Sequence, residues 1–253
     1  MEKARFNSMM HKASLASYAV GIFAIVSSLA SSIVTSSLMN PIDSAIASGT
    51  VTSSTLTQLT QVMNMILPLT LITLLITLVL AIVFAYFNLA VGSAYDMGLL
   101  KLALVSYVIV NIATIPVTLA VYTLLPILSQ LLANPGNASA IVAQALGTIL
   151  LVGLAALLII VFLLLFVIGF LVSLNRLQRE TGISLFGWAM YLGIIGIILY
   201  FLNSVFSAVG IPFSIGDLLL QITIVLFGLG LSRAAKEGKV PKSLRDRAAP
   251  TQT

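Results

Sequence analysis

The sequence predicts an all-α bundle of six transmembrane helices, and two observations lead to this prediction. Of the 253 residues, 60% are hydrophobic and only 8% are charged. A soluble domain has ~25% charged residues, so a soluble globule of this composition could not cover its surface. The stretch between Lys101 and Arg176 contains no Asp, Glu, Lys or Arg. It holds two apolar arms, each longer than the ~20 residues that cross a bilayer.

The spans are predicted to be helices rather than the strands of a barrel. Lipid offers no partner to an unpaired N–H or C=O, so a span must be a helix or part of a closed barrel. Barrel strands alternate apolar and polar residues over ~10 positions. The runs in this chain are apolar on every face, which favours the helical bundle.

Six spans and one tail account for the whole chain. The first apolar run is nearly twice the ~7–15 residues of a signal peptide, so we expect an uncleaved span. Turn signals at 134–137 and 210–212 separate spans three and four and spans five and six. One domain, residues 1–231, is expected to hold spans at 14–39, 62–91, 102–125, 141–174, 183–207 and 213–231. Residues 232–253 are expected to form a basic, mobile tail.

The placement of the basic residues predicts the orientation. Residues 40–59, 126–139 and 208–212 connect the spans on one face and contain no Lys or Arg. All twelve basic residues fall on the other face, which the positive-inside rule assigns to the cytoplasm. We therefore expect a multi-pass protein of the cell membrane with both termini cytoplasmic. The one glycosylation sequon, which begins at Asn137, would be external.

Two short segments of similar sequence suggest an internal repeat of three helical hairpins. Residues 12–18 and 101–107 are identical at four of seven positions, and Tyr18, Tyr107 and Tyr191 begin the odd-numbered spans. One interpretation is a quasi-threefold arrangement of parallel hairpins. The other is an interfacial aromatic belt, which places tyrosines there without any repeat.

The motif Thr181-Gly182 followed by Leu185-Phe186, within residues 177–189, resembles a family of uncharacterised membrane proteins found mainly in archaea. In that family a similar motif opens the penultimate pair of spans. The likeness covers about residues 175–195 and elsewhere extends only to composition. Because the family has no established activity, the resemblance implies an architecture and no functional residues.

Residues for catalysis are scarce. The chain has no cysteine, which excludes disulfides, thiolate metal sites and cysteine nucleophiles. Its only histidine, His11, lies among basic residues before the first span and has no partner for a metal site or a triad. We therefore expect no enzyme, no cofactor and no metal site.

Asp217 and Gln221 form a candidate site at the outer face. Asp217 is the one acid that can lie within a span, and Gln221 follows on the same helix face. An ionisable residue inside a membrane indicates function by default, so an ion or substrate role stays open. We favour a simpler role, because a carboxylate in the first turn of a helix complements the helix N-terminus. No deeper carboxylate is expected, which disfavours proton-coupled transport.

Uncharged polar and small residues form stripes on three spans. Packing explains them simply, since such residues let helices approach and form hydrogen bonds of ~0.6–2 kcal/mol each. The alternative is a hydrated path between spans two and three. The stripes are Thr70, Thr73 and Thr77 on span two, Asn111, Thr114, Pro116 and Thr118 on span three, and Gly21, Ala24, Ser28, Ser31 and Thr35 on span one.

The predicted function is a non-enzymatic scaffold or accessory subunit that binds other membrane proteins, or itself, in the lipid bilayer. The alternative is a passive channel or permease for a small solute or ion that uses the Thr- and Asn-lined path. Nucleic acid is not expected, because no aromatic residues are interleaved with the basic ones. The tail is expected to attract anionic lipid headgroups at ~1 kcal/mol per basic residue. Its basic residues are Arg233, Lys236, Lys239, Lys242, Arg245 and Arg247.

Overall fold

The fold is all-α, as predicted. The computed structural model describes residues 3–47, 53–133, 136, 138–202 and 214–239, and these residues form six helices and no strand. In chain order the helices are α1 (Lys3–Ala47), α2 (Ser53–Ala94), α3 (Gly98–Ala133), α4 (Ala138–Thr181), α5 (Ser184–Phe201) and α7 (Ile215–Lys236). All six are long and apolar enough to cross a membrane, which confirms a multi-pass membrane protein class.

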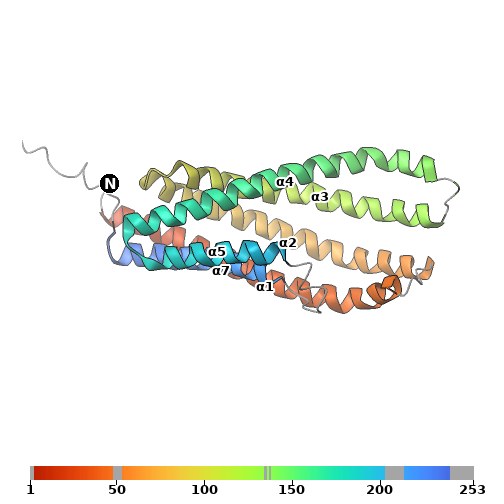
Figure 1. The fold of residues 1–253 in the computed structure, drawn as a ribbon, viewed down its shortest axis with the longest axis horizontal. Coiled ribbons are helices and arrows are strands. Elements are labelled where there is room, and N and C mark those ends of the chain that lie inside the picture. The colour runs from red at the N-terminus through yellow and green to blue at the C-terminus, as the bar shows by residue number, and fades with distance from the viewer. Residues whose placement is uncertain (1–2, 48–52, 134–135, 137, 203–213, 240–253) are drawn as a thin grey trace, which may run out of the picture.

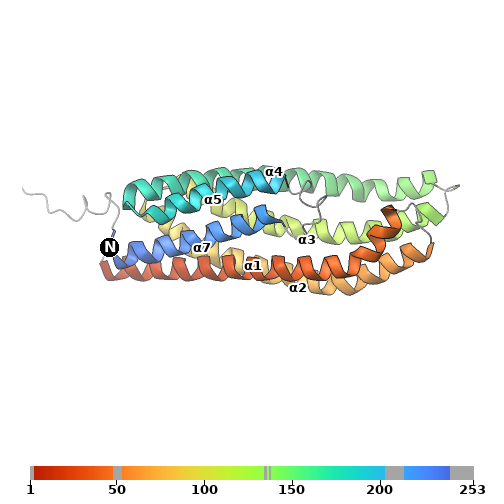
Figure 2. The ribbon, with the colours of Figure 1, turned by 60° about the horizontal axis from the view of Figure 1, so that its bottom comes forward.

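The helices form a closed ring in the order of the chain. Each helix packs against the next, and α7 returns to pack against α1. The ring therefore contains three antiparallel hairpins, α1–α2, α3–α4 and α5–α7 (Figures 1 and 2).

The helices differ greatly in length, and this shapes the ring. α1 to α4 have 36 to 45 residues, whereas α5 has 18 and α7 has 22. At 1.5 Å per residue, α4 is about 66 Å long and α7 about 33 Å. Figures 1 and 2 show that α5 and α7 accompany only one half of the four long helices.

The first four helices run further than predicted. α1 continues to Ala47 and α2 begins at Ser53, so most of the expected connection at 40–59 is helical. α3 and α4 likewise extend through much of 126–139. The prediction was wrong there because it read a change of composition as a helix end. Ser and Thr cost less than ~0.7 kcal/mol each within a helix, so polar residues do not stop one.

Compact turns join the helices at the end of the bundle where α3 and α5 begin. The turn after α2 contains Asp96, whose φ is 52°, and the Met97 N–H donates to Gly92 O over 2.7 Å. α4 is followed by Gly182, whose φ is 71° and whose N–H donates to Gln178 O over 2.8 Å. Such left-handed caps satisfy carbonyls that a helix end leaves free, so two or three residues suffice for each turn.

Tyr95 ties three elements together at this same end. Its hydroxyl donates to Lys239 O over 2.8 Å, just beyond α7, and its carbonyl accepts from Arg176 of α4 over 3.4 Å. Its ring lies 6.2 Å from that of Phe6 on α1. We call this end of the bundle the basic end.

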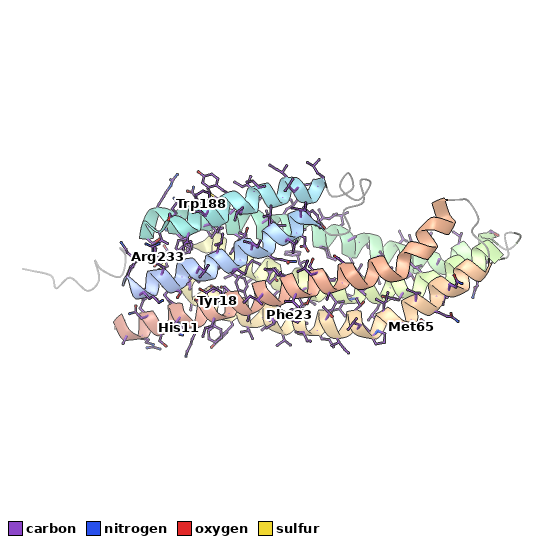
Figure 3. All side chains as sticks on the ribbon, turned by 90° about the horizontal axis from the view of Figure 1, so that it is seen from below. His11, Tyr18, Phe23, Met65, Trp188 and Arg233 are labelled. Carbon is purple, nitrogen blue, oxygen red and sulfur yellow. The ribbon has the colours of Figure 1, made fainter. Side chains whose placement is uncertain are left out.

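The described basic residues all belong to the basic end. Figure 3 shows His11 and Arg233 near it and Met65 towards the opposite end. The cationic residues are Lys3, Arg5, Lys12, Lys101, Arg176, Arg179, Arg233, Lys236 and Lys239. Lys242, Arg245, Arg247 and Asn137 lie outside the described residues.

Aromatic rings fill the centre of the ring of helices. Phe227 of α7 lies 5.1 Å from Phe170 of α4, 6.1 Å from Phe186 of α5 and 6.4 Å from Phe84 of α2, measured between ring centroids. Tyr107 of α3 bridges Phe84 at 5.7 Å and Phe166 at 4.7 Å. We call these six residues the aromatic cluster.

Glycines allow α7 to lie close to both of its neighbours. A methyl group on Gly216 would meet the backbone of α5, at Tyr200 N and Gly196 O. One on Gly228 would lie 3.1 Å from Ser14 O of α1. The short helix is therefore held by backbone approach on two sides, as is common in membrane bundles.

The three tyrosines that begin the odd-numbered spans, Tyr18, Tyr107 and Tyr191, do not occupy equivalent environments. Tyr107 belongs to the aromatic cluster inside the ring, whereas Tyr191 is 57% exposed on the outer surface. Tyr18 is partly buried on α1. The structure thus contains three hairpins, but the tyrosines do not mark a repeated position.

Candidate functional site

The first turn of α7 lies inside the bundle, level with the middle of the long helices. Asp217 in that turn lines one cavity together with Leu163 of α4. Beyond this level α4 stays almost wholly apolar over residues 149–162, about 21 Å of helix. The structure therefore places Asp217 level with the middle of the bundle rather than at the end of the long helices, while its position relative to the outer membrane surface stays a prediction. The sequence predicts a short last helix, but it does not predict where along the longer helices that helix begins.

Asp217 is not the N-cap of α7. Ser214 is the cap, and its hydroxyl accepts from the Asp217 N–H over 3.1 Å. The Asp217 carboxylate turns towards the interior, where Oδ2 accepts from Ser28 Oγ and from Gln221 Nε2, each over 2.9 Å. The predicted pairing of Asp217 with Gln221 on one helix face is confirmed.

This group of polar atoms is incompletely satisfied. Gln221 is only 9% exposed, and its Oε1 is buried without a hydrogen-bond partner. Both hydrogen bonds to the Asp217 side chain end on Oδ2, which leaves Oδ1 able to accept more. The ion pairs found among the described residues involve only Glu237, so Asp217 has no cationic partner there. A buried polar group without a partner is costly, and such sites commonly accept a ligand or water.

A polar space of about 480 Å³, widely open to the surface of the bundle, lies on one side of Asp217 and Gln221. Its wall is rich in hydroxyl groups from α1, α2 and the residue before α7. These are Ser27, Ser28, Ser31, Ser32, Thr77 and Ser214. We call this space the polar cavity.

A second cavity of about 210 Å³ lies on the other side of the same two residues. Its wall is apolar and includes Tyr107, Phe166 and Phe170 of the aromatic cluster. Ala24, Asp217 and Gln221 line both spaces, so the carboxylate stands at their border. We call this space the apolar cavity.

The predicted stripes on spans two and three are satisfied within their own helices. Each hydroxyl or amide donates to the carbonyl four residues earlier over 2.8 to 3.0 Å. This holds for Thr70, Thr73, Thr77, Asn111, Thr114 and Thr118, while Pro116 is exposed on α3. Of these residues, Thr77 lines the polar cavity, and it does so with α1 and α7 rather than with α3. The polar space therefore lies between α1, α2 and α7.

The small-residue stripe on span one is the better guide to the site. Ala24, Ser28 and Ser31 line the polar cavity, and a methyl group on Gly21 would lie 3.3 Å from Gln221 O. Spacing alone identified this face of α1. It missed Ser27, Ser32 and Ser214, whose serine side chains carry no distinctive pattern in the sequence.

A second group of buried polar residues lies nearer the basic end, on the other side of Phe84. Asn88 Nδ2 donates to Phe84 O over 2.9 Å and to Ser17 Oγ over 3.4 Å. Three buried oxygens have no partner, namely Ser14 Oγ, Asn88 Oδ1 and Ser106 Oγ. We call Ser14, Ser17, Asn88 and Ser106 the inner polar cluster. No prediction from the sequence included this cluster, although an asparagine within an apolar run is itself a signal of a buried polar site.

The described part of the tail forms a small charged group at the end of α7. Arg233 Nε lies 2.6 Å from Glu237 Oε1, and Lys239 Nζ lies 3.9 Å from Glu237 Oε2. The hydrogen bond from Arg233 holds the pKa of the Glu237 carboxyl below its ordinary value. These groups are exposed, so the pair stabilises the helix end only slightly.

Comparison with family models, with curated proteins and with solved structures finds no match to this chain. The class that the fold defines is a six-helix membrane bundle.

Proposed function

We propose that this protein is a non-enzymatic permease that takes up a small solute in the cavities beside Asp217. One observation carries the proposal. Asp217 and Gln221 line both the polar and the apolar cavity, and the buried Gln221 Oε1 has no hydrogen-bond partner. A carboxylate inside an apolar bundle is expensive to maintain. Natural proteins keep such groups where they contact a solute, an ion or a proton.

The positions of polar groups inside the ring of helices support passage of a solute through the bundle rather than binding alone. Unpartnered polar atoms occur on both sides of the aromatic cluster, at Gln221 on one side and at Asn88 on the other. The cluster closes the interior between them. A permease needs such a barrier between two half-sites, and rearrangement of packed helices can move it.

If the basic end is cytoplasmic, the side of the membrane that the polar cavity faces follows. The positive-inside rule favours that orientation, because the described cationic residues gather at one end. The polar cavity would then face the outside of the cell membrane, and the aromatic cluster would close the route to the cytoplasm. Both ends of the described chain would lie on the cytoplasmic side.

The scaffold interpretation explains less of the molecule. Helix packing accounts for the threonines that bond to their own carbonyls, since these need no solute. It gives no reason for a carboxylate that has no cationic partner among the described residues and lies beside a buried amide oxygen without a hydrogen-bond partner. A permease accounts for both features.

Solute entry into reconstituted vesicles tests the proposal. Vesicle shrinkage and recovery would be followed by light scattering with neutral, anionic and cationic solutes. Potassium and valinomycin balance the entry of an anion, and a membrane-permeant anion such as thiocyanate balances the entry of a cation, so that solute accumulates inside in both cases. We expect faster recovery than in empty vesicles for at least one solute class. Asp217→Asn should slow that recovery, whereas Thr73→Val should not, because the Thr73 hydroxyl serves only its own helix.

Recovery at the rate of empty vesicles for every solute class would count against a permease. A loss of transport in Thr73→Val equal to that in Asp217→Asn would retain the permease but contradict a path beside Asp217, and would return the path to the threonine stripe of α2.

A further inference from the structure

We propose that the ligand of this site is a small organic cation, consisting of an ammonium group on an apolar body of about one aromatic ring. This inference rests on the proposed function and names its substrate class. The structure places one carboxylate at the border between a hydroxyl-lined cavity and an aromatic-lined one. A ligand that fills both spaces must be charged at one end and apolar at the other.

The charged end of the ligand has three kinds of acceptor within the site. Asp217 Oδ1 is available, because both hydrogen bonds to this side chain end on Oδ2. Gln221 Oε1 is buried and has no partner. The hydroxyl of Ser28 donates to Asp217 and keeps lone pairs that can accept. An ammonium group offers several N–H donors, so it satisfies these oxygens together.

The apolar end of the ligand has a matching space beyond the carboxylate. The apolar cavity measures about 210 Å³, and an apolar cavity of ~150 Å³ holds benzene. Rings from Tyr107, Phe166 and Phe170 belong to its wall. Aromatic faces also attract a neighbouring cation, which adds to the pairing with Asp217.

Other ligand classes fit the same residues less well. An anion would meet the Asp217 carboxylate, and no Lys or Arg lines either cavity. Divalent metals prefer several carboxylates, and the described residues contain no group of three or more His, Asp or Glu. A bare monovalent ion would leave the apolar cavity empty. A neutral ligand would leave the carboxylate without a counter-charge.

Binding to the purified protein tests this inference without any measurement of transport. The probe is 2-phenylethylammonium, and the shift in the midpoint of thermal unfolding is followed in one detergent over a range of probe concentrations. The comparison compounds are 2-phenylethanol, which removes the charge, methylammonium, which removes the ring, and sodium chloride. Since a hydrogen bond to a charged group is the stronger kind, we expect 2-phenylethanol, which lacks the charge, to bind about tenfold more weakly or worse. Methylammonium keeps the charge but leaves the apolar cavity unfilled, so we expect it to bind more weakly as well.

Two variants show whether the probe binds at the proposed site. Asp217→Asn should weaken binding of 2-phenylethylammonium about tenfold or more, and its own unfolding midpoint without probe reports whether it folds. Ser28→Ala should weaken it less, because only one neutral contact is lost. Leu164→Ala, on the lipid-facing surface, should not change the affinity and controls for partition of the probe into detergent.

The results distinguish this inference from the proposed function. Equal stabilisation by the alcohol and the ammonium would overturn the organic-cation assignment, as would binding that Asp217→Asn leaves unchanged or stabilisation by sodium alone. Transport of a neutral or anionic solute without cation binding would reject the inference and retain the permease. Binding of the probe without flux of any solute would retain the inference and reject the permease.

Discussion

Gly216→Ala is expected to destabilise the protein more than any other single methyl group added to α7. Its new Cβ would meet backbone atoms of Tyr200 and Gly196 on α5, which no change of rotamer can relieve. Overpacking typically costs about 1–3 kcal/mol, and a backbone contact belongs at the upper end. The variant should show a lower midpoint of thermal unfolding in detergent. Because Asp217 is the next residue, binding at the site should weaken as well.

A matched glycine on α4 serves as the control. Gly153 is also helical, but a methyl group there would meet nothing within 4 Å. Alanine favours a helix by about 1 kcal/mol over glycine, so Gly153→Ala should be neutral or slightly stabilising. If Gly216→Ala were equally neutral, the close packing of α7 against α5 would be wrong.

Phe227→Ala is also expected to have a large effect, because it should both lower the stability of the protein and let small ions leak through it. Phe227 is fully buried and contacts rings from three other helices. Truncation of such a residue costs about 3–5 kcal/mol in soluble cores. The space left behind also lies between the apolar cavity and the inner polar cluster. Vesicles that contain the folded variant should therefore leak small ions that the parent retains.

Phe201→Ala provides the comparison for this variant. Phe201 is 73% exposed at the end of α5, so its truncation should change neither the unfolding midpoint nor the leak. A stable Phe227→Ala variant without leakage would mean that the aromatic cluster does not close the interior.

The class of fold could be predicted from the sequence because long uncharged apolar runs admit almost no other structure. The spans 102–125 and 141–174 lie within α3 and α4, and the hairpin between them is observed. Helix ends were predicted less well, because Ser- and Thr-rich segments continue a helix as readily as they leave it. Glycine and asparagine at left-handed positions are the better signal, and Gly182 illustrates it.

The site could be predicted only in part, for a geometric reason. The i, i+4 spacing of Asp217 and Gln221 is a local property of one helix, and the structure preserves it. The depth of Asp217 depends on how far α7 reaches along the longer α1 and α4, which no local pattern records. The threonines of α2 and α3 looked like a path because both stripes are periodic. Periodicity shows which residues share a face, but it does not show which helix that face meets.

The proposed permease requires the polar cavity to be a water-filled space inside the membrane, open to the side opposite the basic end. The chain has no cysteine, so a single introduced thiol can be followed without background. The cysteine thiolate attacks reagents of the methanethiosulfonate type, forming a mixed disulfide and releasing methanesulfinate, and the thiolate forms in water and not in lipid. We would therefore place cysteine at Ser31, in the cavity, and at Leu164, which is exposed on the lipid-facing surface beside Leu163 of the apolar cavity.

A charged, membrane-impermeant reagent added from outside intact cells makes the measurement. The account predicts that Ser31→Cys reacts readily and that Leu164→Cys does not. Bound 2-phenylethylammonium should slow the reaction of Ser31→Cys. Failure of Ser31→Cys to react from either side, or reaction at the same rate as Leu164→Cys, would contradict a water-filled cavity within the bundle.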